Sequence, residues 1–218
     1  MPRTLVATVI MFLAGHAAAG PWPREEGAFF TALAGRLAVD GPGAGEDSYT
    51  TLYGEYGLTQ RTTLGVDLGY GSTNTHKAVG FLRLPFERTP ADTRMAYQLG
   101  VGQIDDHAVV RPGFSAGRGI SLGDRAGWLT VETLGEVSLE TGAIDLKADF
   151  TVGLNTGTRT KMVVQMQTGR DDGGSGYARL APSVLFEQRP GRHIEVGVTT
   201  GIEGDDSVAL KLGTWHSF

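Results

Sequence analysis

The chain has 218 residues, 33 glycines, no cysteine and a formal net charge of −5. Glycine without a fixed period excludes collagen, and a hydrophobic content of 40% excludes a disordered chain. The lack of cysteine excludes a disulfide scaffold, a cysteine-ligated metal and a lipid anchor on cysteine. The acidic balance, with no basic patch or tail, argues against nucleic acid as a partner.

The first segment has the pattern of a secretory signal peptide. Arg3 supplies a positive start, residues 5–14 form an apolar run, and Ala17 and Ala19 are the small residues that a cleavage site requires. The run is too short to cross a bilayer as a helix, and a short buried helix is the alternative. We therefore expect residues 1–19 to be removed and residues 20–218 to form one exported domain.

The remainder repeats one local pattern, in which apolar residues alternate with polar or small ones between short runs of Gly, Asp, Asn, Thr or Pro. A period of two at even spacing predicts the strands of an all-β sandwich or barrel. The predicted strands are 28–39, 48–57, 62–71, 77–87, 94–103, 108–117, 127–138, 143–154, 160–169, 176–187, 193–202 and 207–218. Strands of ~9–11 residues cross a bilayer, and twelve is an even number, as in bacterial single-chain barrels. Ten or fourteen strands stay open, because the segments around Ile104 and Ile120 can be divided differently.

The two faces of the predicted strands differ in character. In 62–71 one face carries Leu64, Val66 and Leu68, while the other carries glycine, threonine and Asp67. A soluble sandwich also alternates, but small and charged residues on one face suit a crowded, wet lumen, and the aliphatic face suits lipid. No later segment has the apolar length of a transmembrane helix, so membrane insertion requires a closed barrel. We therefore predict an all-β, closed antiparallel transmembrane β-barrel.

Charges on the lumen face are nearly balanced in sign. Because unpaired charge in a narrow interior is costly, this balance predicts a network of ion pairs. The predicted network consists of Arg36, Glu55, Asp67, Arg83, Arg111, Glu132, Glu136, Lys147, Asp149, Arg179, Glu195 and Lys211. Such a network either closes the barrel or leaves a small polar pore, and the sequence leaves both open.

The connections between strands also divide by charge. If residue 28 starts at the periplasmic side, acids gather on the outer connections and arginines on the inner turns. The acids expected to form an extracellular rim are Asp105, Asp106, Asp171, Asp172, Asp205 and Asp206. Lipid-facing aromatic residues gather near the inner strand ends, as in the girdle of a membrane interface. They are Phe29, Tyr56, Phe86, Tyr97, Phe114, Phe186 and Phe218.

The last strand ends the chain on an aromatic residue. Lys211, Gly213 and Phe218 resemble the C-terminal signal by which the barrel assembly machinery recognises outer-membrane proteins, and His216 stands where that signal usually has Tyr or Phe. Residues 55–66 (EYGLTQRTTLGV) and 80–85 (GFLRLP) resemble hairpins of small proteobacterial transporter barrels grouped with phenol meta-pathway outer-membrane proteins. The resemblance implies an outer-membrane transporter barrel in a Gram-negative bacterium, with no particular substrate.

Residues that could carry chemistry are few. The four histidines after residue 19 match no zinc spacing, and we expect neither a metal nor a cofactor. Asp105, Asp106 and His107 are the best case for a hydrolase at the rim, but charged runs are usually solvated loops.

These observations predict a narrow pore or passive small-solute transporter with an acidic extracellular mouth. The alternatives are a structural barrel without channel activity and, less favoured, a rim hydrolase. The expected partners are outer-membrane lipid and lipopolysaccharide, the barrel assembly machinery, and small polar or cationic solutes.

Overall fold

The computed structural model describes residues 20–90, 92–204 and 206–218. The predicted signal peptide and Asp205 therefore lie outside the described residues. The strands are β1 Phe29–Asp40, β2 Ser48–Thr59, β3 Thr62–Gly71, β4 His76–Pro85, β5 Thr93–Ile104, β6 His107–Leu122, β7 Arg125–Ser138, β8 Ile144–Asn155, β9 Thr160–Arg170, β10 Gly176–Arg189, β11 Arg192–Glu203 and β12 Val208–Ser217. No helix among the described residues is long and apolar enough to cross a membrane.

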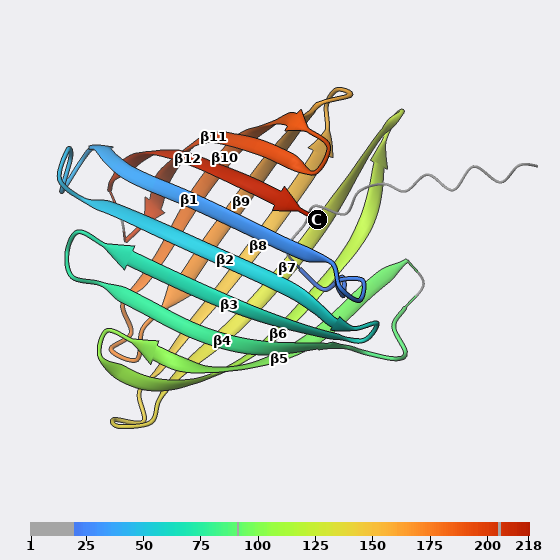
Figure 1. Ribbon diagram of the computed structural model, residues 1–218. Coiled ribbons are helices and arrows are strands. Elements are labelled where there is room, and N and C mark those ends of the chain that lie inside the picture. The colour runs from blue at the N-terminus through green and yellow to red at the C-terminus, as the bar shows by residue number, and fades with distance from the viewer. Residues whose placement is uncertain (1–19, 91, 205) are drawn as a thin grey trace, which may run out of the picture.

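The strands close into one antiparallel barrel (Figure 1). Each strand pairs with its neighbours in sequence, and β1 pairs with β12 to close the ring. The predicted fold class and the count of twelve strands are confirmed, and the alternatives of ten and fourteen are wrong. Ile104 ends β5, and Ile120 lies inside the sixteen-residue strand β6.

The alternation along the strands produces an inverted distribution of polarity. Leu212 is 62% exposed and Leu99 is 56% exposed on the outer surface, whereas Arg111 and Glu195 are each 1% exposed inside. A soluble protein rarely exposes apolar surface so widely or buries charge without a reason. An aliphatic exterior around a charged interior is the pattern of a barrel whose outer face meets hydrocarbon.

Glycines on the lumen face allow aromatic rings to lie against the barrel wall. A methyl group at Gly65 would lie 2.1 Å from the Phe81 ring, and one at Gly69 would lie 2.1 Å from the hydroxyl of Tyr49. The Tyr177 ring covers Gly169 in the same way. Because these rings lie against the wall, the space along the barrel axis stays open.

The hairpin of β6 and β7 is longer than its neighbours. Its ladder continues to the pair Leu122–Arg125, whereas β5 begins to pair with β6 only at Arg118. In Figure 1 this yellow-green hairpin extends beyond the rim of the barrel. The inner end of this hairpin therefore provides a surface on which the residues that precede β1 can pack.

Candidate functional site

The barrel encloses a cavity of about 830 Å³. Asp47, Thr73 and Asp105 line it near the outer connections, and Phe30 and Trp215 line it at depth. Of the twelve residues predicted to form the lumen network, eleven line this cavity, and Glu55 is buried outside its lining. Eleven side chains that the sequence spreads over nine strands thus meet in one volume.

An inner cluster of charges centres on Glu55 of β2. Its carboxylate accepts hydrogen bonds from Arg24, from Arg83 of β4 and from the Tyr53 hydroxyl, the last over 2.6 Å. Arg83 also lies 3.5 Å from the carboxylate of Glu132. The charges of both arginines are therefore compensated within the wall, as buried charges require.

A second group, the cross-lumen chain, alternates cation and acid over five strands. Lys77 lies 2.9 Å from Asp67, and Arg111 lies 2.6 Å from the other oxygen of Asp67. Glu136 lies 3.8 Å from Arg111 and 2.6 Å from Lys147. Because each acid in the chain contacts two cations, these charges compensate one another locally.

Glu195 of β11 forms a third group near the closing strands. Its Oε1 accepts hydrogen bonds from Lys211 and Ser183, each over 2.7 Å, and its Oε2 accepts one from the Trp215 indole over 3.0 Å. The carboxylate is therefore fully engaged, with Lys211 as its ion-pair partner.

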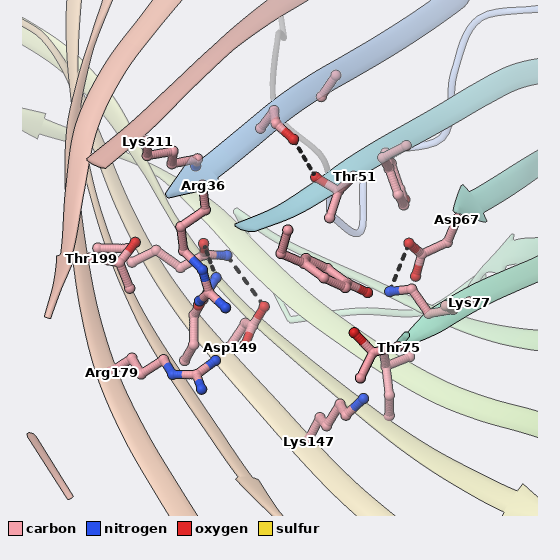
Figure 2. Close-up of a pocket in the computed structure, with 18 of the residues that line it drawn as sticks. Arg36, Thr51, Asp67, Thr75, Lys77, Lys147, Asp149, Arg179, Thr199 and Lys211 are labelled. Carbon is pink, nitrogen blue, oxygen red and sulfur yellow. Dashed lines mark hydrogen bonds and ion pairs between the residues drawn. The ribbon is translucent and has the colours of Figure 1, made fainter. Parts of the chain in front are cut away.

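Three more predicted network residues point into the cavity from separate walls (Figure 2). Figure 2 shows Arg36 of β1, Arg179 of β10 and Asp149 of β8 directed toward the same space. The Arg179 guanidinium lies 4.7 Å from the centre of the Tyr177 ring, and Asp149 accepts a hydrogen bond from Gln165 over 3.3 Å. The structure thus places all twelve predicted residues inside the barrel, nine of them in the three groups described above.

The segment before β1 lies across the inner end of the lumen. Pro21 is completely buried, and the Trp22 ring lies against the backbone at Gly117 of the long hairpin. Arg83 donates a hydrogen bond to the Gly20 carbonyl over 2.7 Å, and Arg24 binds Glu55. We call residues 20–24 the inner segment. The cavity lining includes no residue of the inner turns, so in this structure the cavity faces the outer connections.

At the outer end, Asp105 and Asp106 form the two-residue turn between β5 and β6. Their φ angles are 46° and 69°, the left-handed values that a type I′ hairpin turn requires and that Asp tolerates. The Asp105 carboxylate accepts a hydrogen bond from the His76 amide over 2.8 Å, and Asp106 lies 3.2 Å from the His76 ring. Turn geometry and contact with the neighbouring hairpin therefore account for this pair.

Asp171, Asp172 and Asp206 also lie in connections between strands. Asp171 accepts a hydrogen bond from the Ser175 amide over 2.8 Å, and Asp172 accepts one from the Ile144 amide over 3.4 Å. Asp206 is exposed, and Asp205 is outside the described residues. No group of three His, Cys, Asp or Glu within the described ranges is arranged to hold a metal ion.

The residues of the predicted assembly signal lie along β12 and after it. Lys211 faces the cavity, and Gly213 lies close to the carbonyl of Leu33 across the seam. His216 packs against Phe218 with ring centres 6.0 Å apart. The amide of Phe218 donates to the Phe29 carbonyl over 2.9 Å, so the last residue extends the seam between β1 and β12.

Sequence reasoning missed several residues of this interior. The sequence pattern does not single out Lys77, although it shares the face of Arg83, because it stands at the predicted strand boundary. The sequence pattern assigns no role to the inner segment, because the segment has no periodicity; its one indication is Trp22, a tryptophan between two prolines upstream of the first strand. Tyr53 and Trp215 lie on the correct face, but a phenol or indole gives no sequence sign of a charged partner.

Solved structures of outer-membrane channels share this architecture. The KdgM porin matches with a TM-score of 0.62 at 7% identity, over 87% of this chain and 99% of the porin. The NanC porin matches with a TM-score of 0.62 at 8% identity, over 86% and 98%. An outer membrane channel from Pseudomonas putida F1 matches with a TM-score of 0.56 at 11% identity, over 92% and 99%. Because the identities are this low, these matches show a shared fold alone.

No protein-family model matches the chain, and no curated protein matches it either. The likeness to the phenol meta-pathway proteins therefore stays a prediction from residues 55–66 and 80–85.

Proposed function

We propose that this chain is an outer-membrane β-barrel of a Gram-negative bacterium that acts as a narrow pore or passive transporter for small polar solutes. The observation that carries the proposal is the axial cavity of about 830 Å³, which is lined by charged and polar side chains inside an aliphatic exterior. A wet, charged interior stabilises polar solutes that lipid excludes. The porin fold of the structural neighbours supports the same proposal.

The inner segment makes the proposed pore narrow. Solute that enters from the outer side meets residues 20–24 before it reaches the inner end, and Trp22 is the largest side chain among them. We therefore expect small conductance steps from the intact protein. Replacing Trp22 with alanine removes the ring from Gly117 and is expected to enlarge the steps.

Planar-bilayer recording on the protein purified from outer membranes tests this proposal. Discrete steps in the intact protein, enlarged in Trp22→Ala, are the expected result. Silence at every voltage in both proteins would contradict a pore. The second candidate, a structural barrel without channel activity, would then stand. One observation supports this candidate: the inner segment lies across the lumen.

The rim is proposed to set ion preference. Aspartates at the outer connections give the entrance a negative potential that extends ~8 Å at physiological salt. A charged funnel of this kind concentrates cations and repels anions. We expect a cation-preferring reversal potential in a salt gradient, reduced when Asp105, Asp106, Asp171, Asp172, Asp205 and Asp206 are changed to asparagine. Anion preference at low salt, or no change in that variant, would contradict an electrostatic role of the rim.

A hydrolase at the rim is the least supported candidate. Asp105 and Asp106 have the geometry of a hairpin turn, and His107 lies 2.9 Å from Glu140. These features are typical of hairpin tips that contact their neighbours. Alanine variants of these residues that keep any lipid- or peptide-cleaving activity of the preparation would dismiss this candidate.

A further inference from the structure

We propose that cleavage of the signal peptide after Ala19 creates an α-ammonium at Gly20 that pairs with Glu132 of β7 and fixes the start of the inner segment. The predicted cleavage site borders the described residues, so the position of Gly20 decides where the new chain end lies. A barrel without channel activity would hold its first residue in the same way, so the proposed pore is not required.

Gly20 is buried at the inner end of the lumen. Its carbonyl accepts a hydrogen bond from Arg83 over 2.7 Å, and Pro21 after it is completely buried. A methyl group at Gly20 would lie 3.0 Å from the Thr130 side chain and 3.3 Å from the Trp22 ring. Cleavage next to Gly20 therefore leaves an amine in an enclosed place rather than in bulk water.

The charge of this amine has to be compensated within the barrel. An α-amine is mostly protonated at neutral pH, and an ammonium has three N–H donors and no acceptor. Burying such a group is costly unless it forms hydrogen bonds and an opposite charge lies beside it. A chain that starts at Gly20 therefore needs a carboxylate within reach of its first residue.

Glu132 is the carboxylate with unused acceptors beside Gly20. Within the described ranges it accepts no hydrogen bond, and its one ion-pair contact is with Arg83, over 3.5 Å. The two terminal nitrogens of Arg83 already donate to the Gly20 carbonyl, Glu55, Tyr53 and Gln98. Arg83 therefore supplies charge to Glu132 but no hydrogen bond.

Two contacts place Glu132 close to Gly20. One terminal nitrogen of Arg83 binds the Gly20 carbonyl, and the other lies 3.5 Å from the Glu132 carboxylate. Thr130, which lies against Gly20, precedes Glu132 by two residues on β7, so both side chains face the lumen. With the carbonyl held by Arg83, rotation about the Cα–C bond of Gly20 can bring the freed ammonium to the carboxylate.

A second acid adds negative charge at this place. Asp149 of β8 is the direct cross-strand partner of Glu132, and like charges in such positions are unfavourable. Among the described residues, Asp149 accepts one hydrogen bond, from Gln165, and forms no ion pair. Lys147, the next lumen-facing residue on β8, is engaged with Glu136. An ammonium at the chain end would reduce the repulsion between the two carboxylates.

The site connects processing of the chain to closure of the inner end. Before cleavage, residue 20 has a single amide N–H and no charge, so it offers Glu132 no ion pair. After cleavage, ion pairs hold both ends of the inner segment, with Glu132 at Gly20 and Glu55 at Arg24. The segment is therefore expected to bind more firmly in the processed chain.

Chemical labelling of the α-amine tests the proposal. The protein is purified from outer membranes, and intact mass and N-terminal sequencing identify its first residue, which is expected to be Gly20. An N-hydroxysuccinimide ester at neutral pH should modify this amine at least about tenfold more slowly in the folded barrel than in the unfolded protein, because an ion-paired ammonium does not react. A chain that begins elsewhere, or equal rates in the two states, would overturn the proposal.

Variants of Glu132 separate the ion pair from burial alone. Glu132→Gln is expected to raise the labelling rate of Gly20 by about tenfold, and Glu132→Asp, which keeps a carboxylate, should recover part of the protection. Glu87→Gln removes an exposed acid and is the matched control, which should react as the intact protein does. Heat-modifiability on gels checks folding. Unchanged labelling in folded Glu132→Gln would contradict the pair.

A chain with one added residue gives a second measurement that leaves the barrel wall unchanged. Two barrels are refolded into detergent, one starting at Gly20 and one with a serine before it. The added residue displaces the ammonium from Glu132, so the longer chain should label faster and lose its folded gel band at a lower temperature. Equal labelling and equal unfolding temperatures of the two barrels would overturn the proposal even if Glu132→Gln does not fold.

Discussion

Glu55 links the barrel wall to the inner segment through one side chain. It is 1% exposed and binds Arg24 from the segment and Arg83 from β4. Removing one member of a buried ion pair leaves the other charge without compensation, which costs more than the pair itself contributes. The residue therefore combines a role in stability with a role in holding the inner end.

Glu55→Gln is predicted to destabilise the barrel by about 3–5 kcal/mol, because two buried arginines lose their shared countercharge. Urea unfolding of the barrel refolded into liposomes measures the change. Glu87→Gln is the control, since the Glu87–Arg61 pair is exposed and exposed pairs contribute only about 0–1 kcal/mol. Equal unfolding midpoints for the two variants would show that Glu55 is not part of a coupled buried cluster.

Glu140, outside the strands, gives a pH prediction at the outer end. A hydrogen bond from His107 and another from the Ala108 amide hold the pKa of Glu140 below its ordinary value. A carboxyl with a lowered folded-state pKa stabilises the folded state above its unfolded-state pKa, and this contribution is lost as pH falls through the folded-state value. NMR titration should place the Glu140 midpoint below that of a peptide glutamate and move it upward in His107→Ala. An unchanged midpoint would mean that the contact is absent in solution.

Paired strands in this barrel combine glycine with an aromatic ring on the neighbouring strand. Gly65 of β3 lies beneath Phe81 of β4, which in turn stacks on Tyr53 at 5.7 Å. The glycine supplies room and the ring covers the bare backbone, as in aromatic rescue of a strand glycine. The pairing explains why so many lumen positions are glycine without any turn.

Gly65→Ala is predicted to cost about 1–3 kcal/mol, because its methyl group would overlap the Phe81 ring and force it off the wall. Gly80→Ala is the matched control on β4, where the nearest atom to the new methyl is 4.0 Å away. Unfolding midpoints compare the two, and Phe81→Leu in the Gly65→Ala background should recover part of the loss. Similar midpoints for Gly65→Ala and Gly80→Ala would contradict tight packing at this pair.

Most strands could be predicted because lipid and lumen impose opposite demands on alternate residues. The inner ends of β6 and β7 could not, since Gly117, Gly119 and Gly127 suggest turns. The ladder nevertheless continues to Leu122 and Arg125. A hairpin that extends past its neighbours has no lipid face to impose the alternation, so its length is invisible to a pattern of period two.

The sequence predicts which residues face the lumen, but it does not predict which of them pair with one another. The alternation of side chains along each strand is enough to place Arg83 and Glu132 in the lumen. It does not say that Glu55 serves Arg24 as well as Arg83, because Arg24 lies in a segment without periodicity. Partner choice depends on the stagger of strands around the ring, and that stagger is a property of the closed barrel.

At the scale of the whole molecule, the seam between β1 and β12 determines closure. Phe29 and Phe218 exchange backbone hydrogen bonds of 3.1 and 2.9 Å, and their ring centres lie 6.3 Å apart. Phe218 is therefore placed both to complete the seam and, as the sequence predicts, to present an aromatic terminus to the assembly machinery.

Deletion of Phe218 is predicted to leave an exported chain that accumulates in the periplasm without heat-modifiability on gels. Refolding of the purified variant into detergent separates the two roles. Folding in detergent with failure in cells assigns the residue to recognition, whereas failure in both assigns it to the seam. Normal levels of the variant in the outer membrane would contradict both.

The contacts of the inner segment bear on the order in which the barrel forms. The segment contacts β2 through Glu55, β3 through Thr63 and β4 through Arg83, and it lies close to Gly117 of β6 and Thr130 of β7. Every one of these partners precedes β8 in the chain. A half-built sheet of β1 to β7 already offers these five contacts, so the segment can dock before the C-terminal strands are added, and the closing barrel then surrounds it.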